Sequence, residues 1–487
     1  MVSALLQDNP LLVKHLRARL RPQTLIPWIA IVVILCVLAA YASHALDEPE
    51  IPFYLLLVLQ GFLLQLVGSS QVLASVSRAR ESGMLEFHRM SPQPPGAIVL
   101  GFLLGGPILE YLLFACTLPF SFFIALGQVG LLPWLAISAE MLIVALLYHA
   151  AAVLAGLMLP RATSSPVVLL ALFFVLMPLW GLAMSITPLL FLTVFPIVTA
   201  AVTPAHGIPQ FGSLPWSIAI SLLHQLPVLI LLLFAATRKM RHEGTPPFSK
   251  LEAIVAYALG GLLALLDVGV AADRPETLFR GGSGNLAIAS CYGLFLLGLL
   301  LILAVSPDAS SFARGSRQAR RLGQRGLSLW HDHAPNWVAT AAFLVICIII
   351  GLALVSPGIS LGSETALWAP ATAACALAFF ALTKQSFNLF FRKNSTLYLL
   401  LVLFLFWGVP LVLGLLLSMA EQTRAAETVI SLSPLAGIGI SLWPHARGGE
   451  TAAVVTAFTA SAVLAICSVV LCRIAVQTAA QGVERTT

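Results

Sequence analysis

The chain alternates long apolar runs with short polar segments from end to end. Most runs hold roughly 20 residues or more, the length at which a helix crosses a hydrocarbon core of about 30 Å. A barrel strand would need only about 10 residues of strict alternation, so the runs predict helices. We predict an all-α polytopic membrane protein with about twelve spans, at residues 25–45, 53–76, 96–126, 134–159, 167–187, 214–236, 251–272, 285–305, 335–355, 367–383, 395–420 and 451–472.

The composition excludes an ordinary soluble domain. The 487 residues are 59% hydrophobic and only 9% charged, with a mean hydropathy of +0.97. Seven cysteines lie inside or at the ends of the runs without the paired spacing of a metal site, so we interpret them as small apolar residues. We expect neither a metal nor a cofactor on this chain.

The basic residues predict the orientation in the membrane. All 26 Lys and Arg residues lie outside the twelve runs, and all but four lie in the loops opposite the acidic loop Asp47-Glu48-Pro49-Glu50. Because basic residues of short loops are retained in the cytoplasm, both termini are predicted to be cytoplasmic and the acidic loop external. The net charge of +6 then reflects topology, and its expected partners are anionic lipid headgroups rather than a nucleic acid.

Residues 1–24 precede the first span and are themselves patterned. Asp8 or Asn9 can cap a helix, and Pro10 suits a first helical turn. An apolar stripe and a basic face follow, formed by Leu12, Val13, Leu16 and Leu20 and by Lys14, Arg17 and Arg21. The pattern predicts an amphipathic interfacial helix on the inner leaflet that ends at Pro22, with a disordered basic tail as the alternative.

A charged insert, residues 78–92, separates the second apolar run from the third. Its sequence is Arg78-Ala-Arg-Glu-Ser-Gly-Met-Leu-Glu-Phe-His-Arg-Met-Ser-Pro92. At helical pitch Met84, Phe87 and His88 fall on one face, with charged residues over the others. The insert therefore predicts a short helix outside the bilayer that is offered to a partner protein.

These segments together resemble the membrane subunit of a type-2 ABC transporter. The resemblance covers residues 1–240 and depends on the opening Asn9-Pro10-Leu-Leu-Val-Lys14-His-Leu-Arg17, on Arg80-Glu81-Ser-Gly83 and on the following Ser91-Pro92. It implies a permease in a bacterial-type inner membrane and short re-entrant helices at 188–213, a proline-broken segment without Lys, Arg, Asp or Glu. It also implies that a coupling helix binds a cytoplasmic ATPase through Arg80, Glu81, Gly83, Met84, Phe87 and His88.

The second half, residues 241–487, resembles a diverged copy of the first half, residues 25–240. Gly83-x-x-x-Phe87-His88-x-x-x-Pro92 recurs as Gly326-x-x-x-Trp330-His331-x-x-x-Pro335, and later spans keep the same offset. Gly326, Trp330 and His331 are thus a second coupling candidate, although Glu81 has no counterpart. The alternative is that 306–334 is a solvated loop that binds headgroups. The pathway could be a homodimer or a single-chain pseudo-dimer.

Few ionisable residues fall within the predicted spans. They are Glu110, Glu140, His149, His224 and Asp267. An intramembrane charge is costly unless it is paired or neutralised, which makes each a functional candidate. Glu110 and His224 are expected near mid-depth. For His149 and His224 a structural hydrogen bond is favoured over a substrate contact.

No nucleotide-binding loop of the form Gly-x-x-x-x-Gly-Lys-Ser/Thr occurs in the sequence. ATP and Mg²⁺ are therefore expected on a separate ATPase chain, and no Ser/His/Asp spacing suggests that this chain is an enzyme. Two transport classes remain: an ABC exporter permease coupled through helix 78–92, and a secondary transporter of two six-helix halves driven by an ion gradient through Glu110 or a neighbour. Co-purification of an ATPase would separate them.

Overall fold

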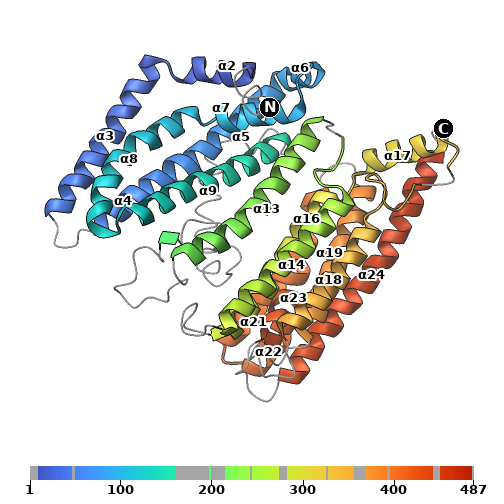
Figure 1. The fold of residues 1–487 in the computed structure, drawn as a ribbon. Coiled ribbons are helices and arrows are strands. Elements are labelled where there is room, and N and C mark those ends of the chain that lie inside the picture. The colour runs from blue at the N-terminus through green and yellow to red at the C-terminus, as the bar shows by residue number, and fades with distance from the viewer. Residues whose placement is uncertain are drawn as a thin grey trace. The chain divides into compact units, whose positions relative to one another are not determined.

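The structure, a computed structural model, describes residues 9–45, 50–158, 197–198, 214–241, 244–273, 282–324, 327–355, 368–391, 395–442 and 450–484. Every regular element within these ranges is a helix (Figure 1). Within the described residues, ten helices are long and apolar enough to cross a membrane. An eleventh crossing is counted if Ser290–Val305 and Ala309–Arg321, which meet at a 57° bend, form one. The fold is therefore that of an all-helical, multi-pass membrane protein.

The first of two compact units extends to residue 243. Figure 1 shows the short helices α2 and α6 at the same end of the unit. Its described elements are α2 (Pro10–Arg19), α3 (Pro22–Ala45), α4 (Glu50–Gly61), the π-helical segment η1 (Phe62–Gly68), α5 (Ser69–Glu81), α6 (Met84–Met90), α7 (Pro95–Gly105), α8 (Ile108–Gln128), α9 (Leu131–Met158) and α13 (Leu214–Arg241).

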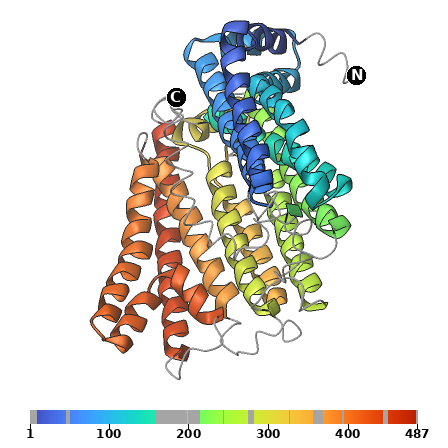
Figure 2. The ribbon, with the colours of Figure 1, turned by 90° about the vertical axis from the view of Figure 1, so that its left-hand side faces the viewer.

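The second unit begins at residue 244. Its long helices run side by side, with α24 in red in the turned view (Figure 2), and α19 packs against both α18 and α24. The described elements are α14 (Lys250–Asp273), α16 (Gly282–Val305), α17 (Ala309–Arg321), α18 (Trp337–Leu354), α19 (Trp368–Phe390), α20 (Ser395–Leu403), the π-helical segment η6 (Phe404–Gly408), α21 (Val409–Met419), α22 (Thr423–Ser431), α23 (Pro434–Leu442) and α24 (Glu450–Glu484).

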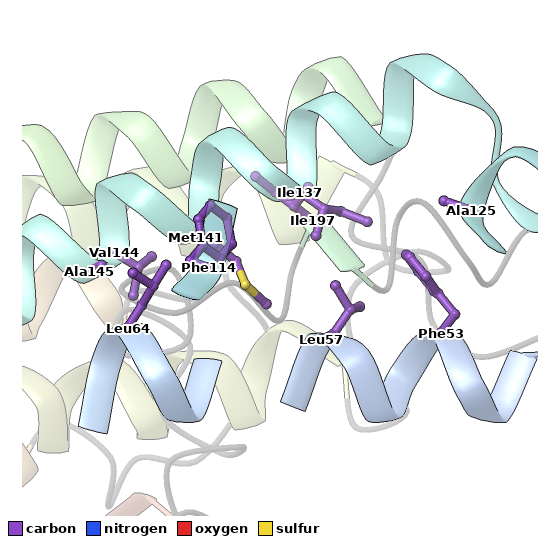
Figure 3. Packing of buried hydrophobic residues seen from close by; sticks show 10 residues of the cluster. All are labelled: Phe53, Leu57, Leu64, Phe114, Ala125, Ile137, Met141, Val144, Ala145 and Ile197. Carbon is purple, nitrogen blue, oxygen red and sulfur yellow. The ribbon is translucent and has the colours of Figure 1, made fainter. Parts of the chain in front are cut away.

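The core of the first unit lies between α4, η1, α8 and α9. Leu64, Phe114, Met141 and Val144 are buried there and point toward one another (Figure 3). Large apolar side chains on the outer faces of the same helices are exposed, among them Val58 at 69% and Phe123 at 73%. A helix that is apolar both inside the bundle and on its surface suits a lipid surrounding.

The ten long apolar helices overlap ten of the predicted spans, and the predicted span 285–305 corresponds to α16. Predicted span 167–187 lies outside the described residues, as does the predicted re-entrant segment 188–213 apart from Ile197 and Val198. In the second unit the short helices α22 and α23 occupy the corresponding stretch, residues 421–450, between the last two long helices.

One predicted span is wrong in its extent. Residues 96–126 were expected as a single crossing, but the chain breaks at Gly106-Pro107 into the short helix α7 and the long helix α8. A proline inside a helix lacks the N–H of the backbone ladder and its ring clashes with the carbonyl one turn earlier. Only α8 is long enough to cross a membrane.

Candidate functional site at the polar end of the first unit

Helix α2 is attached to α7 through its first cap. The Oδ1 atom of Asn9 accepts hydrogen bonds from the N–H groups of Leu11 (3.1 Å) and Leu12 (3.3 Å), which satisfies donors that a helix start leaves unpaired. The Nδ2 atom of Asn9 donates to the carbonyl oxygen of Ala97 at 2.6 Å. Of the two predicted caps, Asp8 and Asn9, the structure therefore uses Asn9, and it uses both ends of the amide.

Two glycines of α7 allow α2 to pack closely against it. A Cβ at Gly101 would lie 2.9 Å from Asn9 Oδ1 and from Leu11 Cβ, and one at Gly105 would lie 3.0 Å from His15 Cβ. Neither methyl group could be accommodated without movement of α2. These small residues allow the backbones of α2 and α7 to approach closely.

His15 lies between α2 and α7 and is largely desolvated. Its ring is edge-on to Phe102, with centroids 6.1 Å apart. Burial, and secondarily the positive charges of Arg19, Lys14 and Arg78, lower the pKa of His15 to about 4. The ring is therefore neutral at physiological pH.

Glu110 lies at the end of a span and not near mid-depth, so the predicted depth is wrong. It occupies the first turn of α8, because the break at Gly106-Pro107 starts that helix only there. The carboxylate lies 3.8 Å from Arg19 Nη1, and Arg19 Nη2 donates to Gln71 Oε1 at 2.6 Å. Arg19 of α2 thus connects Glu110 of α8 with Gln71 of α5.

The predicted helix 78–92 is divided between two elements. Arg78 to Glu81 form the last turn of α5, which continues the second span, and α6 begins only at Met84. Between them Gly83 has φ of +72°, a left-handed conformation that favours glycine. Arg80 Nη1 donates to the carbonyl oxygen of Leu157 at 3.3 Å, so the end of α5 is joined to the end of α9. Glu81 is exposed.

Helix α6 presents an apolar surface to solvent. Met84, Phe87 and Met90 are 37%, 62% and 80% exposed, and we call these three residues the α6 surface. Leu85 is buried on the opposite side. His88 lies partly buried, with its ring edge-on to Phe102 at 6.4 Å. Burial, and then the charge of Lys14, lower the pKa of His88.

Arg89 attaches α6 to the last helix of the unit. Its Nε donates to the carbonyl oxygen of Met240 at 3.1 Å, and it forms an ion pair with Glu86. Sequence reasoning did not single out Leu85, Arg89 or Met90. Helical spacing of three residues from Met84 through Phe87 would have found Met90, whereas no local signal identifies the carbonyl partner of Arg89.

The second coupling candidate is not a helix in the described residues. Trp330 is 58% exposed and His331 is exposed, and both lie in turns between α17 and α18. Gly326 lies outside the described residues. The helical element of this stretch is α17, which ends before the repeated motif begins.

The two histidines of the predicted spans form hydrogen bonds within the first unit. His224 Nδ1 donates to the carbonyl oxygen of Ile220 at 2.8 Å, one turn earlier in α13. His149 Nε2 donates to the carbonyl oxygen of Leu64 in η1 at 2.8 Å, so in the neutral ring Nδ1 accepts from the Tyr111 hydroxyl at 2.8 Å. The structural hydrogen bonds expected for both histidines are present.

A second buried carboxylate lies on α9 of the first unit. Glu140 of α9 is 2% exposed and accepts a hydrogen bond from Gln225 Nε2 of α13. A second polar contact joins Gln60 Nε2 of α4 to Thr117 Oγ1 of α8 at 2.9 Å. These pairs satisfy polar side chains that a lipid surrounding would leave without partners.

A comparison with protein-family models matches no family, and comparisons with curated proteins and with solved structures give no significant match. The length and apolar character of their helices define the described residues as a multi-pass helical membrane protein.

Proposed function

We propose that this chain is the permease of an ATP-driven ABC export system and that separate cytoplasmic ATPase subunits bind the α6 surface. The observation that carries the proposal is that α6 exposes apolar side chains while it is attached to two neighbouring spans. Met90 and Phe87 are exposed, while Arg89 binds the end of α13 and Gly83 joins α6 to the second span. A partner that moves α6 would pull on both spans.

The two halves are proposed to form an internal pseudo-repeat with cytoplasmic termini in a bacterial-type inner membrane. In support, each compact unit ends in a long helix, and the second has short helices α22 and α23 directly before it. Two such halves could form one pathway within a single chain, and a homodimer is the alternative.

Site-specific photo-crosslinking tests the ATPase contact. A photoreactive amino acid at Met90, in the full chain expressed in a bacterial host, should crosslink to a subunit that binds ATP. Phe123 is the matched control because it is also apolar and is 73% exposed. It lies toward the end of α8 that is far from Glu110. Crosslinks to an ATPase from both positions, or from neither, would contradict the proposal.

A second candidate function is an ion-gradient-driven secondary transporter, and the buried pair Glu140–Gln225 favours it. The carboxylate of Glu140 is the better candidate for an ion or proton site, because Glu110 is paired with Arg19 at the end of its span. Transport that is abolished by a protonophore and by Glu140→Gln, and not by ATP depletion, would support this function over the first.

A further inference from the structure

Helix α17 directly follows α16, an apolar helix of 24 residues. Only residues 306–308 separate it from the end of α16, and the chain bends by 57° at this break. Asp308 caps α17 by accepting a hydrogen bond from the N–H of Ser311 at 2.7 Å. Because three residues span at most about 10 Å, α17 starts within reach of the membrane surface.

The two faces of α17 differ sharply. Phe312, Gly315 and Ala319 are buried, and Phe312 packs with Leu389 of α19 and Ala475 of α24. The exposed side is basic and carries Arg314, Arg317, Arg320 and Arg321. The sequence of α17 contains no Asp or Glu. Neither Arg317 nor Arg321 forms an ion pair with another described residue.

The turns after α17 pack on that helix and expose apolar side chains. Leu327 joins the apolar cluster around Phe312, and His333 Nδ1 lies 2.6 Å from Ser311 Oγ, so both ends of this stretch pack on α17. Lys250 Nζ also donates to the carbonyl oxygen of Leu329 at 2.6 Å. Leu329 and Trp330 are thereby held in place with 57% and 58% of their surface exposed.

We propose that the exposed arginines of α17, with Leu322, Leu329 and Trp330, form a docking surface for the anionic lipid headgroups of the adjacent leaflet. Clustered arginines at the end of a span are complementary in charge to such headgroups. Exposed tryptophan and leucine beside them suit the boundary between headgroups and acyl chains.

This inference does not depend on the proposed ATPase contact, because the lipid would bind with or without an ATPase. It gives the two halves different tasks. The α6 surface of the first unit would face a protein, whereas Trp330 and His331 of the second unit would lie at the lipid headgroups.

Fluorescence quenching by brominated lipids tests the proposal on the full chain in proteoliposomes. The signal of Trp330 is obtained as the difference between the native chain and Trp330→Phe. With one fifth of the phosphatidylcholine replaced by brominated phosphatidylglycerol, we expect quenching of Trp330 at least about threefold stronger than with brominated phosphatidylcholine. Raising the salt concentration should weaken this preference.

Two triple variants at Arg317, Arg320 and Arg321 provide the matched comparison. Substitution of all three by Gln should remove the preference for phosphatidylglycerol, and substitution by Lys should retain most of it. Since the three side chains are exposed, circular dichroism and monodisperse elution should be unchanged. Equal quenching of the native chain by both lipids, or a preference that survives in the Gln variant, would overturn the proposal. The proposal would also be overturned if no brominated lipid quenched the fluorescence of Trp330 and only an added protein shielded it.

Discussion

Asn9 donates a 2.6 Å hydrogen bond to the carbonyl oxygen of Ala97, a residue 88 positions later in the chain. The same side chain caps α2, so the attachment of the helix and its start depend on a single amide. Helix α2 is therefore a fixed part of the first unit and not an appendage.

Asn9→Asp and Asn9→Ala should separate these two contributions. The Asp variant keeps the cap acceptor and loses the donor to Ala97, whereas the Ala variant loses both. We expect Asn9→Ala to destabilise the chain by about 2 kcal/mol, roughly half from the cap and half from the buried hydrogen bond. Thermal unfolding in detergent measures the difference. Equal losses for the two variants would show that the cap contributes nothing.

Gly101→Ala should displace α2, because the added Cβ would lie 2.9 Å from Asn9 Oδ1. A loss of about 1–3 kcal/mol is typical for such overpacking. Gly96→Ala is the control on the same helix, since nothing lies within 4 Å of its added Cβ, and it should be nearly neutral. Limited proteolysis between α2 and α3 should report the displacement in the first variant alone.

Gly83 should tolerate Asn better than Val. Its φ of +72° costs a β-branched residue roughly 1–2 kcal/mol or more, although the space around it is open. Asn visits this conformation more readily. The angle between α5 and α6 should therefore change in Gly83→Val and persist in Gly83→Asn. Spin labels on α5 and on α6 would measure it, and unchanged label distances in the Val variant would refute the prediction.

The stability of the first unit should fall as the pH decreases from about 6.5 toward 4. In the unfolded chain His15 takes up a proton near its ordinary pKa of 6.5, whereas the folded pKa of about 4 keeps the ring neutral. The unfolded state therefore gains protons first, and folding is disfavoured progressively across this interval. His15→Leu should flatten the dependence of the unfolding temperature on pH in this window. A variant whose profile has the same slope as the native chain would contradict the assignment.

Hydrophobic runs predicted the long helices well, because membrane spans depend on length and apolar character that a sequence displays directly. Their ends were harder to predict. The run at 451–472 stops at Arg473, yet α24 continues to Glu484 because the following residues are mostly good helix formers. At Gly106 the helix is shorter than the apolar run, because the chain breaks within that run. Glu110 therefore lies at the end of a span and not in its middle.

The polar end of the first unit could be predicted only in part. Met84 and Phe87 are exposed on α6 as helical pitch suggests. The hydrogen bond from Arg89 to a main-chain carbonyl oxygen, however, joins positions 151 residues apart. No local pattern encodes such a contact. Helix α17 was missed for a simpler reason: its apolar stripe of Phe312, Gly315 and Ala319 is narrow and its other faces are strongly polar.

The π-helical segment η1 gives the second span a turn wider than that of an α-helix. Each of its hydrogen bonds reaches five residues along the chain instead of four, and the Leu64 carbonyl within it is also held by His149. Because the same imidazole also pairs with Tyr111 of α8, this one side chain ties the wide turn of the second span to both of its neighbouring helices.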